Sequence, residues 1–137
     1  MSTASALLGD EDDVILRTSR KRRGNPEEVI QRAIIDRLRW HGCLVVSVPN
    51  EGRRSIANGR RMKAQGLRPG FPDLLVYRAG RHALLEVKAP QGRLSPAQAE
   101  THSELHRQGI AVFVVRSQDE AVAALRGIST MRADFEQ

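Results

Sequence analysis

Residues 71–88 read FPDLLVYRAGRHALLEVK, two apolar runs separated by the short polar connection Arg78-Ala79-Gly80-Arg81. Two runs of strand length around a Gly-containing connection predict an antiparallel hairpin. If the turn is centred between Ala79 and Gly80, Asp73 lies directly opposite Glu86. The rest of the sheet is expected to form around this hairpin.

Charged side chains interrupt both apolar runs of the predicted hairpin. Opposed residues share a face of the sheet, with Cβ atoms about 4.5 to 5.5 Å apart. The period of two residues puts Lys88 on the same face as Glu86 and turns Val87 to the other. Two carboxylates this close repel one another unless a cation or proton lies between them. Hard oxygen donors of this kind suit Mg²⁺ or Mn²⁺, not zinc, so Asp73, Glu86 and Lys88 are candidate catalytic residues.

A plainer interpretation of these three residues is also open. Asp73 would then only begin a strand after Pro72, and Glu86 and Lys88 would be a solvated ion pair. Pro72-Asp73 at the head of the preceding strand favours the metal site over that interpretation.

A helix is predicted to begin at Asn25-Pro26, with Asn25 as the N-cap and Glu28 as the acid of a capping box. At 100° per residue, Glu27 lies on the inward stripe of this helix. Glu27 is therefore either a further acid near the metal site or a first-turn residue favoured by the helix dipole. The apolar residues of the stripe are Ile30, Ile34 and Leu38, with Ile35 at its edge.

The remaining pattern predicts an α/β fold in the order αβββαβα. Further strands are expected at residues 44–48 and 110–115, and further helices at 95–108 and from Ser117; a helix near 56–65 is optional. The six apolar residues 110–115 predict a buried interior strand, parallel to its neighbour after a helical crossover. We expect a mixed four-stranded sheet flanked by helices, with a domain at 25–128, a flexible tail at 1–24 and a C-terminal tail at 129–137.

Basic residues outnumber acidic ones, 22 to 16, in this 137-residue chain, and much of the excess is local. Residues 51–70 hold six basic residues and one acid, Glu51. Such a segment indicates a polyanionic partner, although a basic loop can also serve solubility alone. The candidate phosphate contacts are Arg53, Arg54, Arg60, Arg61, Lys63 and Arg68, and Asn50 is added to them.

The composition excludes several other classes of protein. The single cysteine, Cys43, excludes an internal disulfide framework and fits a reducing cytoplasm. No apolar stretch approaches the roughly 18 residues needed to span a bilayer, and the N-terminus is a poor secretory signal. An intracellular protein with no membrane partner is expected, and a bacterial or phage origin is compatible with so compact a chain.

Five motifs in order give the chain a resemblance to the VRR-NUC branch of the PD-(D/E)xK nucleases, whose fold is restriction-endonuclease-like. The resemblance covers about residues 26–126. Its motifs are Val48-Pro49-Asn50, Gly66-Leu67-Arg68-Pro69-Gly70-Phe71-Pro72-Asp73, Leu85-Glu86-Val87-Lys88-Ala89-Pro90, Gly92-Arg93-Leu94-Ser95-Pro96-Ala97-Gln98 and Val114-Val115-Arg116-Ser117.

The resemblance implies roles for individual residues. Asp73 and Glu86 would bind the divalent metal with the main-chain carbonyl of Val87, and Lys88 would orient the attacking water. Glu27 matches the acid of the first helix, with a one-residue shift to Glu28 left open. Gln98 matches a glutamine that approaches the site, but it also stands three residues after Ser95 and is equally explained as a capping-box residue. His102, one turn further on, is in reach of the DNA or the site, but we expect it to be a surface residue.

The resemblance also implies a reaction and a partner. It implies hydrolysis of DNA that leaves a 5′-phosphate. Small members of the family resemble Holliday-junction resolvases, so we expect structure-selective cutting of branched or flapped DNA by a homodimer. A flap, nicking or restriction-type nuclease and a non-catalytic DNA-binding module are the alternatives.

Overall fold

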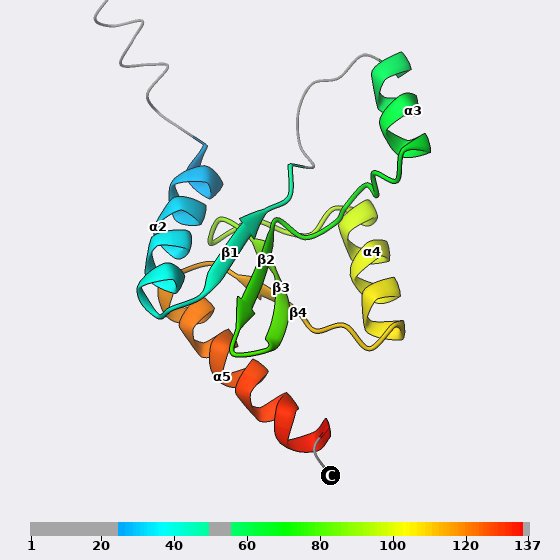
Figure 1. Cartoon of the computed structure of the whole chain (residues 1–137). Coiled ribbons are helices and arrows are strands. Elements are labelled where there is room, and N and C mark those ends of the chain that lie inside the picture. The colour runs from blue at the N-terminus through cyan, green and yellow to red at the C-terminus, as the bar shows by residue number, and fades with distance from the viewer. Residues whose placement is uncertain (1–24, 50–55, 136–137) are drawn as a thin grey trace, which may run out of the picture.

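The predicted hairpin forms the middle of the sheet in the computed structural model, which describes residues 25–49 and 56–135 (Figure 1). β2 spans Leu74–Arg78 and β3 spans Arg81–Val87. They pair antiparallel with Leu74 opposite Leu85, the predicted register. Ala79 and Gly80 have φ values of 51° and 77°, and two positive φ values are the mark of the type I′ turn that suits a two-residue hairpin loop.

The four strands lie in the order β1-β2-β3-β4. β1, Leu44–Ser47, is antiparallel to β2, whereas β4, Val112–Val115, is parallel to β3. The mixed four-stranded sheet is thus confirmed, but the interior position predicted for residues 110–115 is wrong, because β4 lies at an edge. Its apolar sequence has another cause: α4 and α5 both contact it.

Helices cover the two faces of the sheet (Figure 1). α2, Pro26–Trp40, and α5, Gln118–Phe135, pack against one face. Ile34 and Leu38 of the predicted stripe are fully buried there, and so are Leu85 and Val87 of β3. α4, Pro96–Arg107, lies on the opposite side, where the alternation along β3 directs Glu86.

The helix starts follow the sequence signals in part. The Asn25 side chain accepts a hydrogen bond from the backbone N–H of Glu27 at 3.1 Å, which confirms the predicted cap. Glu28 does not complete a capping box; its carboxylate pairs with Arg32 at 3.2 Å on the exposed face. Glu28 lies on the solvent-facing side of the first turn, and Arg32, four residues later, lies on the same side, so the two side chains pair.

The helix considered near residues 56–65 is present as α3, Ile56–Ala64, inserted between β1 and β2. Within the described residues, α3 packs against no other helix or strand and projects from the body of the fold (Figure 1). α5 runs to Phe135, so the predicted domain end at residue 128 lies inside a helix, and the predicted tail at 1–24 lies outside the described residues. None of the described helices is both long and apolar enough to cross a bilayer.

Candidate active site

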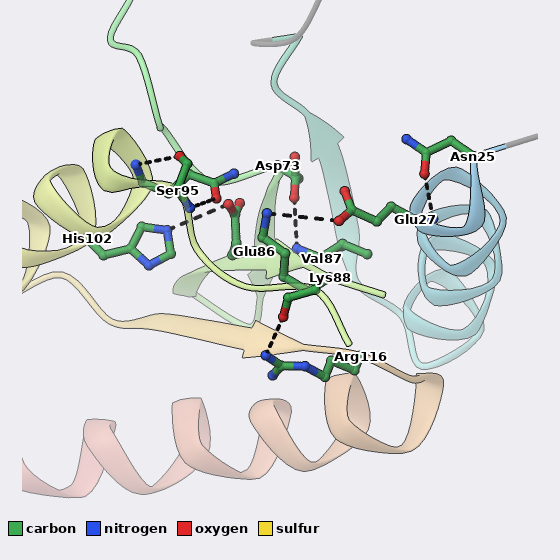
Figure 2. Close-up of polar contacts among 11 residues, drawn as sticks. Asn25, Glu27, Asp73, Glu86, Val87, Lys88, Ser95, His102 and Arg116 are labelled. Atoms are coloured by element: carbon green, nitrogen blue, oxygen red, sulfur yellow. Dashed lines mark hydrogen bonds and ion pairs between the residues drawn. The ribbon is translucent and has the colours of Figure 1, made fainter. Parts of the chain in front are cut away.

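Asp73 stands at the entrance to β2 and is held by both neighbouring strands (Figure 2). Its main-chain carbonyl accepts a hydrogen bond from the N–H of Val48 at 2.8 Å. Its side-chain Oδ2 accepts another from the N–H of Val87, also at 2.8 Å. The paired register ends with Leu74 opposite Leu85, so the predicted pair of Asp73 and Glu86 comes next, and the charge of Asp73 acts on Glu86. The carboxylate is thus oriented by the sheet itself.

Glu86 is a fully buried carboxylate whose charge is only partly compensated. Its exposed fraction is 0%, and neither side-chain oxygen has a hydrogen-bond partner among the described residues. Burial, reinforced by the charge and proximity of Asp73, raises the pKa of Glu86 to about 8, and Lys88 offsets only part of that rise. The interpretation of Glu86 and Lys88 as a solvated pair is therefore wrong. A proton or a cation is required at this point.

Lys88 follows β3 and extends toward the N-terminal turn of α2 (Figure 2). Its Nζ lies 3.9 Å from Oε1 of Glu27, and the two side chains are 9% and 29% exposed. The inward face predicted for Glu27 is thereby observed. The loop after Lys88 is tied down by Arg116, whose Nη2 donates a hydrogen bond to the carbonyl of Gly92 at 3.1 Å. Sequence reasoning gave Arg116 no such part.

α4 carries three buried polar residues, Gln98, Thr101 and His102. Gln98 forms both bonds of a capping box: its Oε1 accepts from the N–H of Ser95 at 2.9 Å and its own N–H donates to Ser95 Oγ at 3.2 Å. The capping interpretation of Gln98 is confirmed, and its catalytic role stays a prediction. His102 is 6% exposed and its Nε2 lies 4.0 Å from Glu86 Oε1, so its prediction as a surface residue is wrong.

Helical spacing is the signal that brings His102 within reach of the site. It stands four residues after Gln98, so both lie on one face of α4 and that face turns toward the sheet. What the sequence did not disclose is which way this face points. Its direction is fixed by the segment before Asp73: the Thr101 hydroxyl donates to the carbonyl of Pro69 at 2.7 Å and accepts from Arg68 Nε at 3.2 Å.

The predicted DNA-binding residues are not all placed. Asn50, Arg53 and Arg54 lie outside the described residues. Arg68 lies against α4 through its bond to Thr101. The others are exposed on α3, apart from the acidic cluster; they are Arg60, Arg61 and Lys63.

The acidic residues can be tested as donors for a metal ion. In the described part of the chain, no three His, Cys, Asp or Glu side chains are grouped as a metal-binding cluster. Two carboxylates and a main-chain carbonyl remain as donors, and they are the hard oxygen ligands that Mg²⁺ and Mn²⁺ accept together with water. The only partly compensated carboxylate of Glu86 is the observation that fits a cation.

An open pocket of about 410 Å³ adjoins this cluster. It lies beside the first turns of α2, and its wall includes Glu27, Ser47 and Asp73. Glu27 and Asp73 thus line an open pocket, whereas Glu86 is fully buried and is not part of its wall.

Comparisons with known proteins agree on one domain. The family model described as "VRR-NUC domain" matches residues 25–119. A solved structure titled "VRR_NUC domain" is 27% identical, with a TM-score of 0.56, and the match covers 75% of this chain and 97% of that one. Another, titled "VRR_NUC domain protein", is 18% identical, with a TM-score of 0.58, covering 77% and 89%, and shows the fold alone. No curated protein is similar enough to be matched.

Proposed function

Because the chain belongs to the VRR-NUC family, a branch of the PD-(D/E)xK nucleases, we propose that it is a divalent-metal-dependent DNA endonuclease. The family makes it a nuclease-type, DNA-processing domain. The single observation that carries the finer proposal is the pair formed by Asp73 and Glu86. One of these carboxylates is oriented by the sheet, and the other is buried without a partner.

The proposed donors are Asp73, Glu86 and the main-chain carbonyl of Val87. The need for positive charge beside Glu86 supports this assignment, as does the oxygen-only character of the set. When bound, Mg²⁺ or Mn²⁺ supplies Lewis acidity to the phosphate and lowers the pKa of its water.

The residues of the chain have distinct proposed tasks. Asp73, held by Val87 and Val48, keeps its carboxylate fixed while the scissile phosphate approaches. Lys88 is only 7% exposed and extends from the strand that carries Glu86, so its ammonium is confined to the site. We assign it to orienting the attacking water and stabilising the developing charge on the phosphate, not to proton abstraction. Glu27 holds Lys88 in that position through their ion pair. The proposed reaction leaves a 5′-phosphate on the product.

Binding is proposed to rest on phosphate contacts from the basic residues, among which Arg60, Arg61 and Lys63 are exposed together on α3. Contacts of this kind are dependent on salt and read little base sequence. Selection by DNA shape follows, with branched or flapped DNA as substrate. A four-way junction offers two equivalent cleavage positions and one chain provides one acidic cluster, so we propose a homodimer for this substrate.

The proposal is tested by incubating the protein with labelled four-way, flap and linear duplex DNA of shared sequence, in Mg²⁺, Mn²⁺ or EDTA. Cleavage of the branched substrates in either metal and none in EDTA is the expected result. Analytical ultracentrifugation of the protein with and without the junction measures the stoichiometry.

Each negative result has its own meaning. If no DNA is cleaved in either metal, the proposal of an endonuclease is rejected in favour of a non-catalytic DNA-binding module. Equal cleavage of linear duplex would remove structure selectivity and favour a nicking or restriction-type enzyme. A single chain per cleaved junction would contradict the homodimer.

A further inference from the structure

His102 and Glu86 present two unsatisfied polar atoms to one another across the interface of α4 and β3 (Figure 2). Both residues are buried, at 6% and 0% exposure. His102 Nε2 and Glu86 Oε1 are 4.0 Å apart, too far for a hydrogen bond, and neither has another partner in the described part of the chain. Burying polar groups without partners destabilises a fold, so the arrangement needs a reason.

A donor that faces an ionised carboxylate forms a shorter and stronger hydrogen bond than one that faces a neutral group. Carboxylates that bind metals are in turn hydrogen-bonded by neighbouring side chains, which fix their orientation. α4 places His102 Nε2 at 4.0 Å from Glu86 Oε1.

We propose that His102 is a positioning residue for the metal site: its Nε2–H donates a hydrogen bond to Glu86 Oε1 when Glu86 binds the divalent cation. The inference rests on the proposed function, whose metal site it extends by one residue. Burial, followed by the charge of His106, lowers the pKa of His102, which favours the neutral imidazole with its single ring N–H. The proton is assigned to Nε2 because that atom faces the carboxylate.

A histidine that only fills space would behave differently on substitution. His102→Leu replaces the imidazole with an apolar side chain of similar bulk and so removes the hydrogen-bond donor. His102→Gln retains a donor, the N–H of its terminal amide. His106, one turn further along α4, is exposed, and His106→Leu is the matched control. Thermal unfolding in EDTA verifies that all three variants are folded before metal is added.

Mn²⁺ affinity, measured by electron paramagnetic resonance of the free ion, separates the two cases. We expect His102→Leu to weaken binding roughly 10- to 100-fold, the usual effect of losing a partner of a metal ligand. His102→Gln is expected to recover most of the affinity, and His106→Leu to leave it unchanged. Wild-type affinity in His102→Leu would overturn the proposal, and so would an equal loss in His102→Gln.

The ring tautomer provides a test that needs no variant. In ¹H–¹⁵N long-range spectra of the Mg²⁺-saturated protein, His102 is expected to show the Nε2–H pattern. An Nδ1–H tautomer with bare Nε2 would overturn the hydrogen bond to Glu86. Absence of any metal binding by the wild-type protein would contradict the proposed function itself and this role with it, whereas binding without the Nε2–H pattern would contradict the role alone.

Discussion

At the scale of single residues, Asp73 owes its position to two backbone N–H groups rather than to side-chain packing. Asn is close in shape to Asp and keeps an oxygen that can accept from Val87, but it carries no charge. We therefore expect Asp73→Asn to fold normally, to bind DNA within a few-fold of wild type, and to lose at least about 100-fold in cleavage. Single-turnover cleavage and binding in EDTA measure the two effects; a fully active variant would exclude Asp73 from the metal site.

Glu86 predicts a characteristic dependence of stability on pH in metal-free protein. Its pKa is about 8 in the folded chain and 4.5 in an ordinary environment, so between these values the folded state retains a proton that the unfolded state has lost. The contribution of Glu86 is fully present below pH 4.5 and declines as the pH rises toward 8.

The measurement compares wild type with Glu86→Gln, because a neutral side chain has no such slope. In EDTA, urea unfolding at pH 5, 6.5 and 8 should show the free energy of unfolding of wild type falling relative to Glu86→Gln by at least about 1 kcal/mol. The relative measure is needed because the lowered pKa of His102 gives the opposite slope. Parallel curves would mean that Glu86 is not protonated in the folded chain.

Sequence reasoning reached the acids because the hairpin is local. A two-residue turn fixes its register, and the register alone brings Asp73 and Glu86 together. The burial of His102 could not be predicted, for the opposite reason. Its burial depends on how α4 is rotated against the sheet, and that rotation is set by contacts with a segment more than thirty residues earlier, such as the bond between Thr101 and Pro69.

At the scale of elements, the segment before β2 is seated against the start of α4 at Gly70. Its φ is +77°, and a Cβ at this position would overlap the Ala97 carbonyl and the Gln98 amide. We expect Gly70→Ala to destabilise the protein by at least about 2 kcal/mol, from the left-handed backbone and from overpacking together, and to reduce cleavage as the segment leaves α4.

Gly109 is the matched control for this substitution. It has the same φ of +77° but open space where a Cβ would stand. Gly109→Ala should therefore cost only the backbone term, about 1–2 kcal/mol, and leave cleavage unchanged. Urea unfolding and cleavage rates are measured for both variants. Equal losses of stability and of cleavage would show that the packing of Gly70 against α4 is unimportant.

β4 shows where pattern reading of a whole element fails. A continuous apolar run predicts a buried strand, but in β4 only Val115 is buried and the other three residues are half-buried, although α4 and α5 both contact the strand. The apolar run carries no information on whether the sheet continues with another strand on the far side of β4. The edge position follows from the connection order of the sheet, which depends on the entire chain.

At the scale of the whole molecule, the exposed basic residues of α3 lie apart from the acidic cluster of Asp73 and Glu86 (Figure 1). α3 carries exposed Arg60 and Arg61 and packs against no other described element, so neutralising them should not affect stability. We expect Arg60→Ala with Arg61→Ala to weaken binding across DNA sequences and to reduce the slope of log K against log salt by about 1 to 2.

Arg37 and Arg39 provide a control of equal charge. Both are exposed at the far end of α2 from Asn25 and Glu27. The double change Arg37→Ala with Arg39→Ala should leave the salt slope of DNA binding near that of wild type. Fluorescence anisotropy between 50 and 300 mM salt, roughly the range over which such slopes are resolved, compares the two variants. An unchanged slope in the α3 variant would mean that α3 faces away from DNA.

The type I′ turn at Ala79 and Gly80 has a kinetic consequence. Hairpins close in about 1–10 μs, before distant segments meet, so Asp73 and Glu86 are driven together while the chain is still largely unfolded. Their repulsion then opposes the folding step itself. In EDTA at pH 8, Glu86→Gln should accelerate refolding several-fold and change unfolding little, as stopped-flow chevron plots would reveal. An effect confined to unfolding would place the encounter of the two acids after the rate-limiting step.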